Sequence, residues 1–362
     1  MKTVINVKEF KNITKELNKV KNVKSLPEGD NIQIKVEDNT YITKNVYQNI
    51  LTIKTNSGTE SGEIVLDNDT IKLLNKLKSG DIEFSDNVIV NGKKNIKFEN
   101  VGFYEKINLK EFKNSFKVTQ EELLRLLEVN YAKAQDETRP ILQGVCFKNN
   151  EVFAVDGYRL SKRTTNEFNC NTQFVINSQA PDILINLLNE SIKNKSNDIV
   201  NVDIFENYVI FSFDNYKLTS LLLEGTCVNI DGILTNSLEE YKRNEITITD
   251  TNKFIESLEF VKESKDNTQG KQPIILNIKD NKVVLSSCKD SITEELDYAE
   301  INSSIEDLRI GFNPKYLIEL SKKCYKNKNF KIIFATKVQP AYITTDNLEN
   351  VELVLPVRLR IN

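Results

Sequence analysis

The alternation of apolar and polar residues divides the chain into strands, each followed by an amphipathic helix. Near residues 3, 115 and 245, an alternating strand leads into a segment in which apolar residues recur every three or four positions. That spacing is typical of a helix with one buried face. Thr119 and Glu122 form a capping box, which marks the start of the second of these helices. Further strand–helix pairs begin at residues 63, 173 and 309, so the pattern predicts six helices, over residues 8–21, 67–78, 119–134, 178–195, 250–265 and 314–328.

The order of these elements repeats along the chain. Val7, Val118 and Ile248 hold the same position in three successive copies, and each copy contains two strand–helix pairs followed by alternating strands. A repeat of this length corresponds to a whole domain. We therefore predict an α+β chain of three repeated domains, each with two helices and antiparallel sheets, over residues 1–113, 114–240 and 241–362.

The segment NEVFAVDGYRLSKR, from Asn150 to Arg163, is predicted to form a β-hairpin. Two alternating runs flank Asp156 and Gly157, and a two-residue primed turn favours this pair because it needs positive φ angles. The Tyr-Arg-Leu that follows raises the question whether the hairpin has a second role.

The composition indicates a globular protein without a common catalytic apparatus. Of 362 residues, 39% are hydrophobic and 28% are charged, and no apolar run is long enough to span a membrane. The first ten residues lack the apolar core of a signal peptide, so we expect a cytoplasmic protein. There is no histidine, and the five cysteines are far apart. Because these features disfavour Ser-His or Cys-His catalysis and zinc clusters, catalysis is a minority hypothesis, with acid/base chemistry by carboxylates left open, and we expect no cofactor and no metal site.

Positive charge is concentrated in the predicted helices. The formal net charge of the chain is −3, yet the six helices carry more Lys and Arg than Asp and Glu. For any single helix, lysines that solvate an exposed face are enough to explain the excess of positive charge. Repetition adds a second interpretation, because three similar domains in an arc with their helices inside present a weakly basic concave surface. Such a surface suits a protein that surrounds a polyanion without holding it tightly.

Four segments resemble the bacterial DNA polymerase III beta subunit, the sliding clamp. They are DETRPILQGVCF (136–147), FAVDGYRLS (153–161), GFNPKYLIEL (311–320) and LVLPVRL (353–359). The resemblance implies a head-to-tail homodimer whose six clamp-type domains form a ring around duplex DNA, with helices lining the hole. It also implies a non-catalytic protein without membrane attachment. The DNA polymerase III catalytic subunit and a clamp loader would dock on it through short linear motifs.

The resemblance further implies a hydrophobic peptide-binding pocket between the second and third domains. A short peptide with two or three apolar side chains needs such a cleft, and a few polar groups fix its orientation. Lys24 and Arg139 are expected to face DNA. The expected pocket residues are Leu142, Val155, Gly157, Tyr158, Arg159, Leu160, Val228, Ile233, Asn313, Tyr316, Leu353, Pro356, Val357 and Arg358.

One segment departs from the family pattern and leaves an alternative open. Residues 226–232, TCVNIDG, replace the Phe-Pro-Asp-Tyr-like turn of family members, so the pocket would prefer a different peptide. The alternative function is a divergent clamp-fold interaction module, which binds partners without serving as a replicative processivity ring. For the apolar pocket residues the alternative is ordinary core packing, and for Arg159 and Arg358 it is a surface ion pair.

Overall fold

The computed structural model of the chain describes residues 1–21, 29–46, 48–55, 58–102, 107–136, 138–194, 198–235, 245–265, 272–301, 307–325, 328–334, 336–345 and 350–359. The chain forms two compact units, and each combines segments that are distant in sequence. Unit 1 comprises Met1–Arg125 and Asn166–Gly225, and unit 2 comprises Leu126–Thr165 and Thr226–Asn362.

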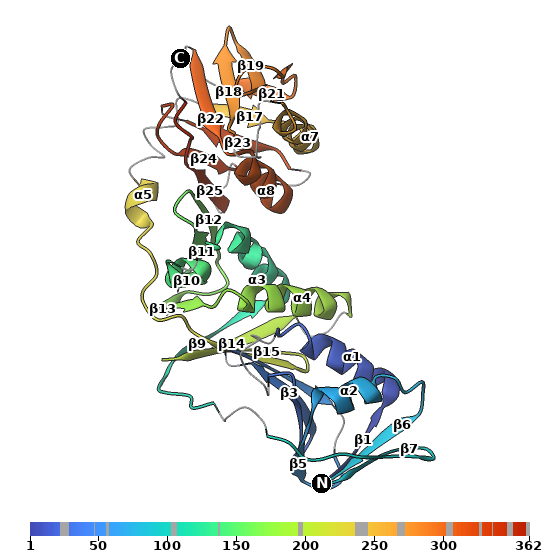
Figure 1. Ribbon diagram of the computed structural model, residues 1–362. Coiled ribbons are helices and arrows are strands. Elements are labelled where there is room, and N and C mark those ends of the chain that lie inside the picture. The colour runs from blue at the N-terminus through green and yellow to red at the C-terminus, as the bar shows by residue number, and fades with distance from the viewer. Residues whose placement is uncertain are drawn as a thin grey trace. The chain divides into compact units, whose positions relative to one another are not determined.

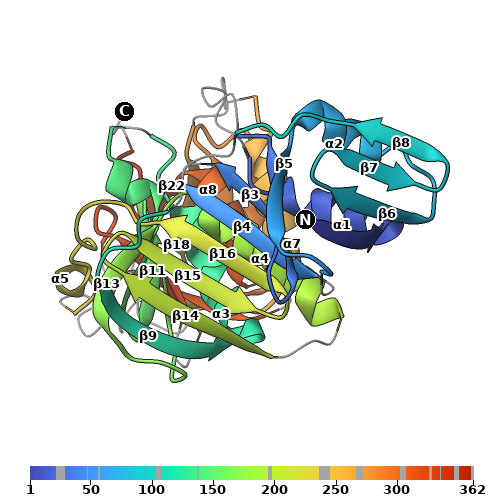
Figure 2. The same ribbon diagram turned by 90° about the horizontal axis from the view of Figure 1, so that it is seen from below.

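Unit 1 is built on two antiparallel sheets, and most of their strands and the helices of the unit are labelled in Figures 1 and 2. The first sheet has the order β1 (Lys2–Asn6), β6 (Asp81–Ser85), β7 (Val88–Asn91), β8 (Lys94–Lys97). The second has the order β5 (Gly62–Leu66), β2 (Ile32–Val36), β3 (Thr40–Val46), β4 (Asn49–Thr55), β16 (Tyr216–Leu221), β15 (Tyr208–Phe213), β14 (Ile199–Phe205), β9 (Phe112–Thr119). The unit also contains β13 (Cys170–Ile176) and the helices α1 (Val7–Leu17), α2 (Asn68–Leu74), α3 (Gln120–Leu126) and α4 (Ala180–Lys193). Helix α1 packs against β1, β3 and β4.

Unit 2 has the same construction. One continuous run of paired strands has the order β10 (Val145–Asn149), β11 (Glu151–Val155), β12 (Arg159–Thr164), β25 (Asn350–Val354), β24 (Ala341–Thr344), β23 (Phe330–Ile333), β17 (Glu245–Ile248), β21 (Ala299–Ile301). A second sheet has the order β20 (Thr293–Glu295), β19 (Lys282–Ser287), β18 (Ile274–Lys279), β22 (Leu308–Phe312). Its helices are α5 (Asp231–Thr235), α7 (Thr251–Lys262) and α8 (Pro314–Cys324), with 3₁₀ turns η1 (Leu127–Ala132) and η2 (Pro140–Gln143).

The six predicted helices are confirmed as α1, α2, α3, α4, α7 and α8. Each begins within two residues of the predicted start, because local capping residues set these starts. Asn6 caps α1, Asp250 caps α7 and Asn313 caps α8, in each case through a side-chain oxygen that accepts a backbone N–H of the first turn. The predicted ends extend too far. Helix α3 becomes the 3₁₀ turn η1 after residue 126, and the short helix α5 is not predicted by the pattern.

The predicted capping box forms only in part. Thr119 Oγ1 accepts the Glu122 amide at 3.3 Å, as expected. The Glu122 carboxylate does not return to the Thr119 amide, because it forms a bidentate pair with Arg125. Glu167 accepts the Thr119 amide instead, at 2.6 Å. A carboxylate from a distant segment thus replaces the local half of the motif.

Helices α7 and α8 of unit 2 lie against one another and cover a core of apolar strand residues (Figure 1). Phe254 of α7 and Phe330 of β23 meet with ring centroids 5.7 Å apart, and Tyr325 stacks on Phe330 at 5.0 Å. No helix within the described part of the chain is long and apolar enough to cross a membrane.

The fold class is that expected, with a strand–helix–strands order that recurs along the chain. The division into domains at residues 113 and 240 stays a prediction. Residues 236–244, which surround the second boundary, lie outside the described residues, as do Lys24 and the C-terminal residues 360–362.

Candidate partner-binding site

The β11–β12 hairpin forms as predicted, but its turn is shifted by one residue. Val155 pairs with Leu160, and the Asp156 amide donates to the Arg159 carbonyl at 3.2 Å, so Gly157 and Tyr158 are the central residues. Gly157 has a φ of +91°, the positive φ that the first central position of a primed turn needs. Asp156 takes another role, because its Oδ1 accepts the amides of Tyr158 and Arg159 at 2.9 and 3.0 Å. The turn therefore projects Tyr158 outward, with 63% of the residue exposed.

A cavity of about 250 Å³ lies beside this turn, within unit 2. Leu142 of η2 is a nearly buried part of its wall, and Gly157 and Tyr158 line it from the hairpin. Arg139 also lines it: a Cβ added at Gly157 would lie 3.5 Å from Arg139 Nη1. The remaining lining residues are Ala134, Asp136, Thr138 and Asp156. The structure thus brings together three expected pocket residues and Arg139, which the resemblance assigned to DNA.

The Arg159 side chain is buried, with 5% of it exposed. Its Nε donates to Asp156 Oδ2 at 2.9 Å, its Nη1 donates to Glu319, and its Nη2 donates to the Tyr131 carbonyl at 2.8 Å. The guanidinium lies over the ring of Tyr131 at 5.1 Å and over that of Tyr316 at 4.5 Å. Burial opposes its charge, yet the hydrogen bond to Glu319 and the nearby carboxylates raise the pKa of Arg159 above its usual value.

Arg163 and Glu352 form a second ion pair, which is buried and is linked to Arg159 through Tyr131. The Arg163 side chain is fully buried, and its Nη1 lies 2.6 Å from Glu352 Oε1. The other Glu352 oxygen accepts the Tyr131 hydroxyl. Arg163 Nε lies 3.6 Å from Glu128 Oε2, and neither Nε nor Nη2 makes a hydrogen bond to a described residue. Tyr131 therefore connects the two arginine clusters, through its hydroxyl to Glu352 and through its carbonyl to Arg159.

This buried cluster keeps its neutral acids protonated. Burial, followed by the charge of Glu352, raises the pKa of Tyr131, of Tyr325 and of the Cys324 thiol well above their usual values. Arg163 opposes the shift at each of these groups, but it does not cancel it. Glu352 is thus the buried counter-ion of Arg163.

We define the C-terminal segment as Leu355–Leu359. Two backbone hydrogen bonds attach it to other parts of unit 2. The Leu355 amide donates to the Tyr158 carbonyl at 2.8 Å, and the Val357 amide donates to the Gly311 carbonyl at 2.8 Å. Pro356 lies between these points, and Val357 and Arg358 are exposed. The segment therefore carries exposed apolar and basic groups from the hairpin turn to β22.

The other expected pocket residues differ in exposure. Leu160 and Leu353, cross-strand partners in β12 and β25, are buried in the core, as the core-packing alternative expects. Val155, Val228, Asn313 and Tyr316 are partly buried. Asn313 also serves as the N-cap of α8, with its side chain accepting the Lys315 amide at 3.0 Å. The side chain of Ile233 and the whole of Lys24 lie outside the described residues.

The altered segment around Val228 is attached to β10. The Cys227 thiol lies 3.7 Å from the Phe147 carbonyl, and Lys148 pairs with Asp231 at 2.9 Å. The residues that replace the usual family turn therefore belong to unit 2, and they hold α5 next to β10.

Sequence reasoning missed several residues that build the site. Glu319 lies three residues after Tyr316 on α8, a spacing that places both on one helix face, so the pattern contained a signal for it. Asp156 lay within the hairpin motif but was interpreted only as a turn residue. Tyr131 lies on a 3₁₀ turn with no periodic pattern, and nothing in the sequence points to it.

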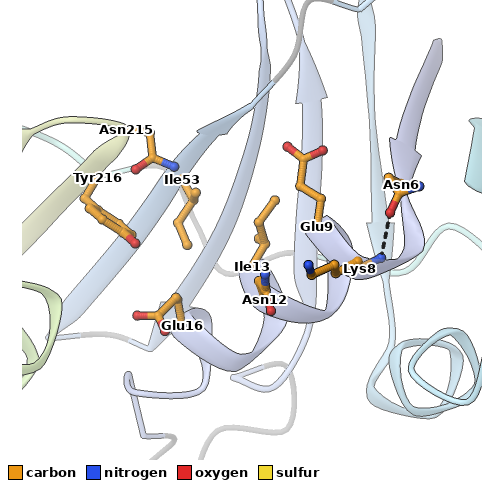
Figure 3. Close-up of a pocket in the computed structure, with 9 residues that line it drawn as sticks. All are labelled: Asn6, Lys8, Glu9, Asn12, Ile13, Glu16, Ile53, Asn215 and Tyr216. Carbon is orange, nitrogen blue, oxygen red and sulfur yellow. Dashed lines mark hydrogen bonds between the residues drawn. The ribbon is translucent and has the colours of Figure 1, made fainter. Parts of the chain in front are cut away.

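A larger cavity, of about 340 Å³, lies in unit 1 beside α1 (Figure 3). Figure 3 shows Ile13 and Ile53 directed into it, with Glu9 and Lys8 at one end and Glu16 and Tyr216 at the other. Its carboxylates are already engaged, since Glu9 accepts the Thr55 hydroxyl and Glu16 pairs with Lys19. None of the predicted pocket residues lines it, and within the described residues no group of three or more acidic or cysteine side chains is arranged to hold a metal ion.

Comparison with protein families decides the relationship. The model of the DNA polymerase III beta subunit, central domain, matches residues 117–227, and that of its C-terminal domain matches residues 241–358. Together the two matches span more than half of the chain. The chain belongs to the DNA polymerase III beta subunit family. The beta sliding clamp of Streptococcus pneumoniae serotype 4 is 29% identical over 247 residues, which are 64% of this chain and 61% of that relative.

Solved structures of beta subunits share this fold along the whole chain. The beta subunit of Streptococcus pyogenes DNA polymerase is 23% identical, with a TM-score of 0.84 over 99% of this chain and 100% of that one. The DNA polymerase III subunit beta of Pseudomonas aeruginosa is 18% identical, with a TM-score of 0.86 over the same shares. A sliding clamp from Bartonella birtlesii, solved bound to griselimycin, is 20% identical, with a TM-score of 0.84 over 99% of this chain and all of that one.

Proposed function

We propose that this beta subunit is a non-catalytic sliding clamp, which encircles duplex DNA as a homodimer and tethers the DNA polymerase III catalytic subunit and a clamp loader. The observation that supports the tethering function is an exposed aromatic side chain beside a cavity at the β11–β12 turn. Tyr158 is 63% exposed beside a cavity that contains Leu142 and Arg139. An exposed aromatic ring beside a cavity offers a partner both a contact surface and a pocket, which is the arrangement that a peptide-binding site needs.

The chemistry of this surface matches a short linear motif. Leu142 and the ring of Tyr158 offer contacts for apolar side chains, and the segment that follows the Leu355–Tyr158 hydrogen bond adds an exposed Val357. No hydrogen bond or ion pair of the Arg139 side chain is found among the described residues, and Asp136 shares the cavity wall with it, so the guanidinium can donate to a peptide carbonyl or carboxylate. Arg159 stabilises the turn through its hydrogen bonds to the Asp156 carboxylate, and in this proposal it does not contact the peptide.

Fluorescence anisotropy of a labelled clamp-binding peptide, taken from the polymerase of the same organism, tests the tethering function. We expect saturable binding, and we expect Tyr158→Ala to weaken it by at least about 10-fold, because buried aromatic anchors dominate such interfaces. Phe260→Ala is the matched control, since Phe260 is also 63% exposed in unit 2 but lies on α7 and does not line the cavity. Equal affinity of wild type and Tyr158→Ala contradicts the proposed site.

We propose that the ring closes through the free edges of two sheets from different copies of the chain. Strand β8 ends one sheet of unit 1, and β20 ends one sheet of unit 2. The first edge is basic, through Lys94 and Lys97, and the second is acidic, through Glu294 and Glu295. Unpaired edge strands with opposite charge favour heterologous pairing over self-pairing.

Sedimentation of the purified protein tests ring closure. We expect Lys97→Glu to raise the dimer dissociation constant about 10-fold, and we expect the charge swap Lys97→Glu with Glu295→Lys to restore the dimer. Lys217→Glu is the control, because Lys217 is equally an exposed strand lysine but lies on β16, inside a sheet. The edge proposal fails if Lys217→Glu dissociates the dimer as strongly as Lys97→Glu does.

A further inference from the structure

Strand β22 ends its sheet, and the C-terminal segment occupies part of its free edge. On one side β22 pairs with β18, with Gly311 opposite Ile275. On the other side Gly311 makes a single antiparallel bridge to Val357, through the hydrogen bond from the Val357 amide. Gly311 of β22 therefore holds Val357, whereas Tyr158 of the hairpin turn, which is distant from Gly311 in sequence, holds Leu355.

Gly311 has a steric function at this bridge rather than a conformational one. Its φ lies outside the left-handed region, so any residue would adopt its backbone conformation. The constraint is space: a Cβ at this position would lie 2.7 Å from Leu359 Cδ2, 3.3 Å from Leu359 Cγ and 3.2 Å from the Val357 carbonyl oxygen. The leucine tip can turn aside, but the carbonyl belongs to the backbone, so relief requires movement of the segment itself.

We propose that Gly311 is a positioning residue for partner binding, because its missing side chain lets the C-terminal segment lie directly on β22. The inference rests on the proposed tethering function, since it assigns Val357 and Arg358 to the surface that contacts the peptide. With any larger residue at this position, the segment lifts from β22 while its attachment at Tyr158 remains. The exposed groups of the segment then move relative to the cavity beside Tyr158.

Two measurements on the full chain test this inference. Hydrogen exchange of the Val357 amide reports the bridge itself, and we expect Gly311→Ala to accelerate it at least about 10-fold. Anisotropy with the same labelled peptide reports binding, and we expect the affinity to fall by about 10-fold. Phe260→Ala is again the control, because Phe260 also lies in unit 2 but is exposed on α7 and does not line the cavity beside Tyr158.

A second variant removes the contact with the Leu359 side chain and keeps that with the backbone carbonyl of Val357. In Gly311→Ala with Leu359→Ala the contact at 2.7 Å is lost and only that with the Val357 carbonyl remains, so we expect part of both effects to be reversed. This double variant also keeps the test open if Gly311→Ala alone fails to fold. Unchanged Val357 exchange in Gly311→Ala overturns the inference.

The outcomes separate this inference from the proposed function. If the wild-type chain does not bind the peptide, the tethering proposal fails, and the role of Gly311 in partner binding fails with it, whatever the exchange data show. If wild type and Gly311→Ala bind equally while Val357 exchange accelerates, the segment is positioned by Gly311 but does not contact the peptide. That result overturns the inference and leaves the Tyr158 site intact.

Discussion

Replacement of Glu352 by alanine is expected to lower the free energy of unfolding by about 3–5 kcal/mol. Arg163 is fully buried, and Glu352 is the carboxylate closest to it, at 2.6 Å. Without Glu352 the guanidinium keeps hydrogen bonds only to Ser161 Oγ and the Lys162 carbonyl among the described residues, with Glu128 at 3.6 Å. The folded state then carries a buried charge without its counter-charge, and urea unfolding followed by tyrosine fluorescence measures the loss.

Two further variants separate charge from packing. Glu259→Ala removes an ion pair to Lys322 in which both side chains are about half exposed, and we expect a loss of only about 0.2–1 kcal/mol. Arg163→Met with Glu352→Leu removes both buried charges and is expected to recover much of the stability, because no unpaired charge remains. Equal losses for Glu259→Ala and Glu352→Ala would mean that the buried pair has no special energetic role.

Charge reversal at Arg159 is expected to destabilise the fold strongly, whereas charge reversal at Arg358 is expected to leave its stability almost unchanged. Arg159→Glu places a carboxylate beside Asp156 and Glu319 and leaves the Tyr131 carbonyl without its donor. We expect a loss of about 3–5 kcal/mol in the free energy of unfolding, together with loss of peptide binding. Arg358 is exposed and has no ion pair within the described residues, so Arg358→Glu should change stability by less than about 0.5 kcal/mol and should weaken peptide binding severalfold.

Urea unfolding and peptide anisotropy, measured on both variants, decide between a structural and a contacting role. Arg159→Glu with wild-type stability and no peptide binding would assign Arg159 to peptide contact after all. Arg358→Glu with reduced stability would show that the exposed end of the C-terminal segment supports the fold.

The helices were predictable because their signals are local. An apolar residue every three or four positions and a capping side chain at the start are both contained within one turn or two of sequence. Asp250 and Asn313 therefore mark the starts of α7 and α8 correctly. The ends were less well defined, because η1 interrupts α3 where Tyr131 and its neighbours meet strands of unit 2, a tertiary contact that periodicity does not report.

The site was predictable in outline but not in its electrostatics. The motif around Gly157 and Tyr158 indicated the turn and its exposed residues, since the hairpin signal is carried by adjacent residues. The buried state of Arg159 depends on Glu319, 160 residues later, and on Tyr131, 28 residues earlier. An arginine in a motif looks the same in sequence whether its partners come from the fold or from a peptide, so only the three-dimensional structure separates the two.

The pairing of Arg163 with Glu352 also has a consequence for the order of events during synthesis. The two residues are separated by 189 positions, and Glu352 belongs to β25, which is synthesised long after β12. Until that strand emerges, β12 has no β25 beside it and Arg163 has no counter-charge from it. Unit 2 therefore cannot pair Arg163 with Glu352 until β25 has been synthesised, and a nascent chain that stops short of residue 352 holds a strand whose charged residue cannot yet be buried.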